Sequence, residues 1–257
     1  MEMTAQMEFK ERPQEYVKYN GKVSYYEFHT GEFEIKEADA KTFEIFDDIY
    51  AKDKNKVYYK GKKIDDLKPS DFVYLGFGYA KYKNKAWFKG EILSEADPES
   101  FVPLKEYYAK DNHNVFLGRK LLDIFDAPSF VVFNNRYTKD KNAAYFWNER
   151  IEQADVFSFE VLGNEYAKDK YRVYHNDKII EKADLKTFEV LEYPYSKDDR
   201  HVYFYGEILK YADSKTFETM GGYGYAKDTK YVYNYGEIVK GASPKNFIPP
   251  PIPHIDY

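Results

Sequence analysis

The chain consists of copies of one segment 29 residues long, and this repetition constrains its fold more than any other feature. The fullest copy runs from Tyr166 to Leu191 and begins Tyr-Ala-Lys-Asp. The opening tyrosine recurs at a step of 29 residues, with a last step of 30, at Tyr50, Tyr79, Tyr108, Tyr137, Tyr166, Tyr195 and Tyr225. A phenylalanine keeps the same step from Phe43 to Phe247. A segment this short has no core of its own, so the copies must stack on one another.

Two further positions of each copy predict short strands joined by a tight turn. One is aromatic in every copy and follows a small or β-branched residue, as strands favour: Tyr58, Trp87, Phe116, Tyr145, Tyr174, Tyr203 and Tyr233. The next holds residues that mostly tolerate positive φ: Gly61, Gly90, Arg119 beside Gly118, Asn148, Asp177, Gly206 and Gly236. A turn residue between two short apolar runs is typical of a β-hairpin.

The rest of each copy adds a helical turn and a further strand. An Ala-Asp pair such as Ala183-Asp184 is typical of a capped helical turn, and the run from Phe188 to Leu191 reads as a strand. We therefore predict an all-β fold of tandem 29-residue repeats with about three short strands plus a helical turn, stacked as an elongated or superhelical array. A propeller-like ring is the alternative. Its blades usually have about four strands and 40 residues, so the short repeat favours the stack.

The expected boundaries follow from where the repeat is recognisable. Residues 19–248 form the array of about eight repeats, the first of them degenerate. Residues 1–18 are a polar N-terminal extension, and residues 249–257 are a Pro-rich C-terminal tail. Prolines cannot donate to a β-ladder, so the tail is expected to cap the array; a partner-binding tail is the alternative.

Composition restricts the classes of function. A net charge of −5 gives no support for nucleic-acid binding. The absence of cysteine removes disulfides, thiolate metal sites and a cysteine nucleophile. No apolar run is long enough for a membrane span or a signal peptide, so we expect a soluble cytoplasmic protein. A signal peptide removed from a precursor is the alternative.

No residue pattern indicates catalysis or a metal site. The histidines His29, His113, His175, His201 and His254 occupy different repeat positions and match no metal motif. An aspartate recurs at Asp53, Asp111, Asp140, Asp169, Asp198 and Asp228, but without the neighbouring oxygen ligands that calcium requires. We expect these aspartates to form turns by bonding their own backbone. We expect no cofactor, no metal and no enzymatic activity.

A lysine precedes each of these turns and recurs without interruption, at Lys52, Lys81, Lys110, Lys139, Lys168, Lys197 and Lys227. Such a stripe suits an anionic polymer. We prefer a structural role, in which each lysine lays its stem over the tyrosine two residues earlier and keeps its charge in water. Binding sites in repeat arrays are expected where the repeats differ.

The repeated motif resembles a known family. The run Tyr50-Ala-Lys-Asp-Lys-Asn-Lys-Val-Tyr-Tyr59 and its copies are similar to the DKNYY repeat family of bacterial proteins, over about Tyr19 to Phe247. The first and fourth repeats match it least. The resemblance implies a bacterial origin and carries over no catalytic residue.

These observations favour a non-catalytic protein-binding scaffold, such as an immunity or inhibitor protein that captures a basic toxin or another effector. The candidate contact residues are aromatic outliers among the repeats: Trp87, Phe125, Phe133 and Trp147. Tryptophan and phenylalanine are enriched at the centre of interfaces. The alternative is a carbohydrate or cell-envelope binding module that uses exposed aromatic rings. We expect no nucleic-acid partner and no membrane span.

Overall fold

The computed structural model describes residues 15–28, 30–163, 165–221 and 224–251. They fall into two compact halves, an N-terminal half that ends at Pro128 and a C-terminal half that begins at Ser129. Each half is described by itself. His29, His254, residues 1–14 of the expected extension and residues 252–257 of the expected tail lie outside the described residues.

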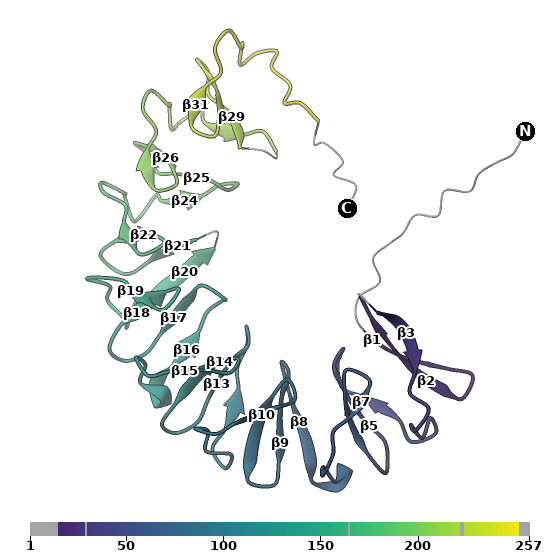
Figure 1. Cartoon of the computed structure of the whole chain (residues 1–257). Coiled ribbons are helices and arrows are strands. Elements are labelled where there is room, and N and C mark those ends of the chain that lie inside the picture. The colour runs from purple at the N-terminus through teal and green to yellow at the C-terminus, as the bar shows by residue number, and fades with distance from the viewer. Residues whose placement is uncertain (1–14, 29, 164, 222–223, 252–257) are drawn as a thin grey trace, which may run out of the picture. The chain divides into compact units, whose positions relative to one another are not determined.

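The N-terminal half contains four antiparallel sheets that follow one another in chain order (Figure 1). The first is formed by β1 (Glu15–Tyr19), β2 (Lys22–Glu27) and β3 (Gly31–Glu34). The second is formed by β4 (Glu44–Ile45), β5 (Tyr50–Lys52), β6 (Val57–Tyr59) and β7 (Lys62–Lys63). The third is formed by β8 (Phe72–Gly76), β9 (Tyr79–Tyr82), β10 (Lys85–Phe88) and β11 (Glu91–Leu93). The fourth is formed by β12 (Val102–Pro103), β13 (Tyr108–Lys110), β14 (Val115–Leu117) and β15 (Lys120–Leu122).

The C-terminal half contains four more sheets of the same kind. The first is formed by β16 (Val131–Val132), β17 (Tyr137–Lys139), β18 (Ala144–Phe146) and β19 (Glu149–Arg150). The second is formed by β20 (Glu160–Gly163), β21 (Tyr166–Lys168), β22 (Val173–His175) and β23 (Lys178–Ile179). The third is formed by β24 (Glu189–Val190), β25 (Tyr195–Lys197), β26 (Val202–Phe204) and β27 (Glu207–Ile208). The fourth is formed by β28 (Glu218–Thr219), β29 (Tyr225–Lys227), β30 (Val232–Asn234) and β31 (Glu237–Ile238).

The all-β repeat fold is confirmed, with one strand more per sheet than expected. Seven of the eight sheets in the described residues have four strands, because the Tyr-Ala-Lys run is itself a strand that pairs on both sides. Three residues are too few to show an alternating pattern, so the sequence did not reveal this strand. The connections between sheets hold single turns, which form 3-10 helices at η1 (Pro69–Asp71) and η2 (Ala127–Ser129). Strand β1 begins at Glu15, so the expected boundary after residue 18 lies inside the first sheet.

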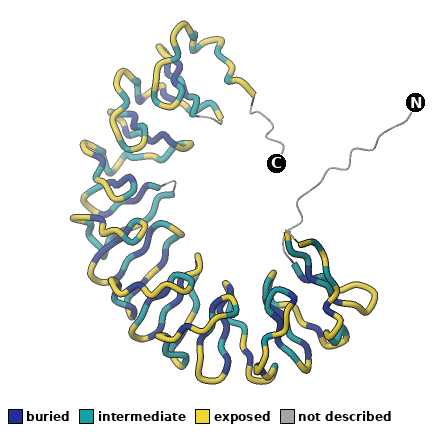
Figure 2. The backbone as a smooth tube through the Cα atoms, viewed as in Figure 1, coloured by how far each residue is buried: buried dark blue, intermediate teal, exposed yellow. Residues whose placement is uncertain are grey.

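The hydrophobic core lies between successive sheets. In the C-terminal half, Tyr137 and Ala144 of one sheet pack against Ala167 and Tyr174 of the next. Neighbouring residues of a strand point to opposite faces, so Tyr166 contributes to the following cluster with Tyr203. Both faces of a sheet are therefore covered, as the buried strands in Figure 2 show. Each sheet of a half stacks on its neighbours, as the length of the repeat requires.

The opening tyrosine also joins successive sheets by hydrogen bonds. The Tyr137 hydroxyl donates to the carbonyl of Glu165 at 2.6 Å, and the Tyr79 hydroxyl donates to that of Tyr107 at 2.6 Å. The Tyr195 hydroxyl donates to the carbonyl of Gly224 at 2.8 Å. Burial raises the pKa of the Tyr195 hydroxyl to about 12. The buried hydroxyl thus has a hydrogen-bond acceptor, as buried polar groups require. A phenylalanine at this position could not form this bond between sheets.

Candidate functional site

The turns of each four-stranded sheet lie at the two ends of its strands. The turn between the second and third strands begins with the repeated aspartate, except at Tyr82 of the third sheet, and defines what we call the Asp rim. At the other ends of the strands lie the turn between the first and second strands and the two-residue hairpin between the third and fourth; we call this the hairpin rim. The two turns of the hairpin rim are bonded to each other, as Asn176 N donates to Glu165 O at 2.8 Å.

The Asp rim is fixed by a buried carboxylate with four donors. Oδ1 of Asp169 accepts from the backbone N–H groups of Tyr171 and Arg172 at 2.7 and 2.8 Å. Oδ2 accepts from the backbone N–H of Asp155 at 2.8 Å and from the Tyr174 hydroxyl at 2.7 Å. The same four bonds recur at Asp53, Asp198 and Asp228. The predicted turn-forming role of these aspartates is confirmed.

These hydrogen bonds keep the carboxylate ionised. Burial by itself raises the pKa of the Asp169 carboxyl, but the bonds from Asp155, Tyr174, Tyr171 and Arg172 outweigh it and leave the pKa below its usual value. The acceptor sites of the carboxylate are then occupied by the protein itself. Among the residues that the structure describes, no group of three His, Cys, Asp or Glu side chains is placed to hold a metal ion.

The third sheet replaces this network with a different pair. Tyr82 stands in the aspartate position, and its hydroxyl accepts from Lys68 N at 3.2 Å and donates to Asp66 O at 2.7 Å. The aromatic position in this sheet holds Trp87, which is half-buried and whose Nε1 has no hydrogen-bond partner among the described residues. A tyrosine at position 87 would lack the carboxylate that its hydroxyl bonds in the sheets of Asp53, Asp169, Asp198 and Asp228.

Some lysines of the Tyr-Ala-Lys strands pair with a glutamate across the sheet, and others, such as Lys139, donate to a backbone carbonyl beyond it. Glu160 lies opposite Lys168 in the ladder, and Lys168 Nζ is 2.8 Å from its Oε1. Lys227 Nζ is 3.1 Å from Glu218 Oε1 in the same way. The tyrosine two residues before Lys168, Tyr166, is fully buried by the next sheet. The lysine charges are thus partly neutralised within the scaffold.

The hairpin rim of the C-terminal half exposes aromatic rings at one repeated position. In three of the four sheets, the first residue of the hairpin is aromatic: Trp147, Tyr205 or Tyr235. Their exposed fractions are 51%, 39% and 48%, respectively. Their φ angles are 50°, 49° and 45°, as the first residue of a type I′ hairpin requires. Tyr193, from the neighbouring turn, is 40% exposed, and its ring centroid lies 5.3 Å from that of Tyr205.

The turn residues predicted from the sequence are the second residues of these two-residue hairpins. Gly61, Gly90, Asn148, Gly206 and Gly236 all have positive φ, which confirms the hairpin prediction at these positions. At the other two hairpins the positive φ belongs to the first residue, Gly118 or Asn176, and not to the expected Arg119 or Asp177.

A charged cluster holds this rim in place between sheets. The Glu165 carboxylate forms an ion pair with Arg136, whose Nη1 lies 2.7 Å from Oε1, and its Oε2 accepts a 3.0 Å hydrogen bond from the Tyr193 hydroxyl. Residues of three successive turns therefore meet at one carboxylate. His175 Nε2 lies 3.7 Å from Glu165 Oε2, and burial lowers the pKa of His175. A rim fixed in this way presents its rings without large loss of side-chain entropy on binding.

The four predicted contact residues do not share one surface. Trp147 is exposed on the hairpin rim of the C-terminal half, in edge contact with Phe146 at 6.3 Å. Phe133 is half-buried in the cluster of Tyr137, with Lys139 Nζ 5.5 Å from its ring. In the N-terminal half, Phe125 is buried and Trp87 packs in the cluster between the second and third sheets. Of the four residues, Trp147 is exposed, Phe125 is buried, and Phe133 and Trp87 are half-buried.

Sequence reasoning missed Tyr193, Tyr205 and Tyr235, which are hidden among 28 tyrosines. The available signal for Tyr205 and Tyr235 is their column: the residue before the predicted turn position is Lys60, Lys89, Gly118, Trp147, Asn176, Tyr205 and Tyr235. This column varies, whereas the buried columns hardly do.

Comparison with known proteins identifies the repeat. Comparisons with curated proteins and with solved structures gave no match. The family model described as "DKNYY family" matches repeatedly, at residues 16–148, 79–206 and 122–237. These matches extend over most of the chain, from the first sheet to the last. The chain belongs to the DKNYY family.

Proposed function

We propose that this protein is a non-catalytic scaffold that binds another protein through the hairpin rim. The observation that carries the proposal is the row of exposed rings at Trp147, Tyr205 and Tyr235, each at the first residue of a hairpin. Tyrosine and tryptophan supply large contact areas with few rotatable bonds and dominate interface energetics. The buried columns, by contrast, are occupied in holding the sheets together.

The partner is expected to be basic. The chain carries a net charge of −5, and complementary charge speeds and orients association. A toxin or effector captured by an immunity or inhibitor protein fits this description. A carbohydrate chain is the second candidate, since exposed rings at the same position of three sheets also suit stacking on sugars.

Affinity capture from an extract of the native cell tests the proposal. The bait is the full chain, compared with the triple variant Trp147→Asn, Tyr205→Asn and Tyr235→Asn. Asparagine is chosen because Asn176 occupies the same hairpin position naturally, at φ 57°. The matched control is Tyr171→Asn, an exposed tyrosine on the Asp rim whose equivalents are Asn55 and Asn142.

A stoichiometric protein retained by the wild type and by Tyr171→Asn, and reduced at least about tenfold by the triple variant, supports the proposal. Equal retention by the folded triple variant places the interface elsewhere and contradicts it. Binding on a glycan array that the triple variant loses, with no protein captured, favours the carbohydrate function.

A further inference from the structure

The hairpin rim of the N-terminal half contains a cavity of about 330 Å³. Its walls come from three successive sheets: Asp47 and Asp48 before β5, Phe77 before β9 with Lys89 of the same sheet, and Tyr107 before β13. This volume lies at the lower end of the range for ligand sites and suits one long side chain.

One wall of the cavity carries two carboxylates in different states. Asp47 is anchored, since Oδ1 accepts from the backbone N–H groups of Ile49 and Tyr50 at 2.9 and 2.6 Å, and Oδ2 accepts from the Tyr74 hydroxyl at 2.6 Å. Asp48 is exposed and, within the described part of the chain, forms no hydrogen bond or ion pair. The cavity therefore holds one fixed negative charge and one carboxylate ready to accept donors.

Two aromatic residues also line the cavity. Phe77 is 49% exposed and Tyr107 is 50% exposed. Both residues adopt positive φ, 53° and 60°, which is unfavourable for a bulky side chain. Gly78 and Gly224 occupy the position of Tyr107 in other repeats. Rings are thus present at turns where small residues would fit with less strain.

The Tyr107 ring already lies beside a cation of the chain itself. Lys89 Nζ lies 4.9 Å from the centroid of the Tyr107 ring and 5.3 Å from that of Phe88, within the range of a cation–π contact. Lys89 is the one basic residue that lines the cavity, against the two carboxylates of Asp47 and Asp48. The local charge balance consequently favours a second cation.

We propose that this cavity receives an arginine side chain of the protein partner, an inference that rests on the proposed function. A guanidinium group forms paired hydrogen bonds to a carboxylate such as Asp48, and its flat face stacks on an aromatic ring such as Phe77 or Tyr107. Arginine fits better than lysine because the cavity offers a carboxylate and ring faces together. The N-terminal half would then select basic partners, and the aromatic row of the C-terminal half would add contact area.

Nuclear magnetic resonance titration of the isotope-labelled full chain tests this inference. The probe is the capped peptide Gly-Arg-Gly, compared with the same peptide carrying citrulline, which has the shape of arginine without its charge. We expect the arginine peptide to shift the backbone amides of residues 47–49, 76–78 and 105–107, with a dissociation constant on the order of 1 mM. Citrulline should bind about tenfold more weakly, because a charged hydrogen bond is lost.

Two variants locate the site. Asp48→Asn should weaken binding of the arginine peptide about tenfold, while Asp199→Asn, an exposed aspartate on the Asp rim with Asn112 as its equivalent, should leave it unchanged. Phe77→Asn should also weaken binding because it removes the ring, and asparagine tolerates the positive φ at this position. Unshifted cavity amides, equal binding of the citrulline peptide, or full binding by folded Asp48→Asn would overturn the inference. These outcomes are separate from affinity capture with the triple variant, whose residues lie outside the cavity.

Discussion

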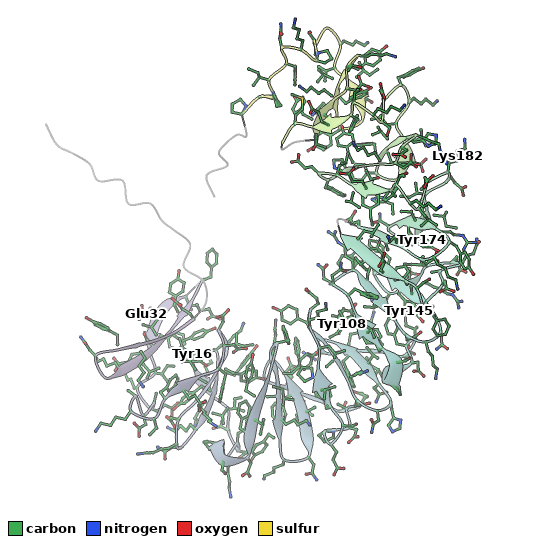
Figure 3. All side chains as sticks on the ribbon, turned by 180° about the vertical axis from the view of Figure 1, so that it is seen from behind. Tyr16, Glu32, Tyr108, Tyr145, Tyr174 and Lys182 are labelled. Atoms are coloured by element: carbon green, nitrogen blue, oxygen red, sulfur yellow. The ribbon has the colours of Figure 1, made fainter. Side chains whose placement is uncertain are left out.

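The Tyr174 hydroxyl donates a 2.7 Å hydrogen bond to Oδ2 of Asp169, and the same carboxylate closes the turn that separates them. Asp169 also accepts from the backbone N–H of Asp155, in the connection from the preceding sheet. The Tyr174 ring packs against Phe159 at a centroid distance of 6.0 Å. One pair of residues thus connects the turn, the core and the joint between sheets. Figure 3 labels Tyr174 and Tyr145, which hold this position in two sheets of the C-terminal half.

The ring and the hydroxyl of Tyr174 should contribute separately to stability. Tyr174→Phe should lower the free energy of unfolding by about 1–3 kcal/mol, because a buried carboxylate loses a donor. Tyr174→Ala should lower it by about 3–5 kcal/mol, since it also leaves a cavity. Phe116 holds this position in another sheet, so the phenylalanine ring fits. Urea unfolding followed by circular dichroism measures both, and losses below about 0.5 kcal/mol would show that the position is not structural.

The exceptional pair Tyr82 and Trp87 should behave as a coupled unit. Tyr82→Asp alone buries a carboxylate without its tyrosine donor, and Trp87→Tyr alone buries a hydroxyl without its carboxylate acceptor. The double variant restores the arrangement of Asp169 and Tyr174. A double-mutant cycle should therefore give a coupling free energy of about 1 kcal/mol or more in favour of the double variant. Additive single effects would contradict the account of this exception.

Close packing at the hairpin should make Gly206 irreplaceable. A Cβ at this position would lie 2.8 Å from Cβ of His175, and the φ angle is +79°. Gly206→Ala should lower the free energy of unfolding by about 2 kcal/mol and the melting temperature by several degrees. The control is Gly241→Ala, where φ is +78° but nothing lies within 4 Å and Lys182 and Tyr211 occupy the equivalent position. Equal effects of both variants would show that contact with His175 is unimportant.

The buried tyrosines should make unfolding at high pH cooperative. Burial raises the pKa of the Tyr50, Tyr79, Tyr137 and Tyr174 hydroxyls above the ordinary value of 10.0, and the bond to Asp169 adds to this for Tyr174. The unfolded chain therefore loses these protons first. Their contribution to stability is complete below pH 10.0 and is lost as the pH rises above it. Tyrosinate absorbance of these residues should appear together with the loss of circular dichroism; ionisation of every tyrosine in a folded chain would contradict this.

The sequence was sufficient for the features that local chemistry determines. The 29-residue step, the hairpin at Gly206 and the turn at Asp169 follow from residue types that permit a single role at those positions. The bond between Asp169 and the backbone of Asp155 was not predictable, because it joins successive sheets. The exposure of Tyr205 was not predictable either, because it results from the position of this residue as the first residue of a hairpin. The burial of Phe125 and Phe133 depends on packing between segments, which their apolar character alone does not reveal.

Hydrogen–deuterium exchange on the complex with the captured partner tests the central claim most directly, that the Asp rim is scaffold and the hairpin rim is the binding surface. In the C-terminal half, binding should slow exchange at the hairpins 146–148, 204–206 and 234–236 and at the turn 192–194. The Asp turns 169–172 and 198–201 should exchange as in the free protein. Protection confined to the Asp turns, with unchanged exchange at the hairpins, would contradict the account.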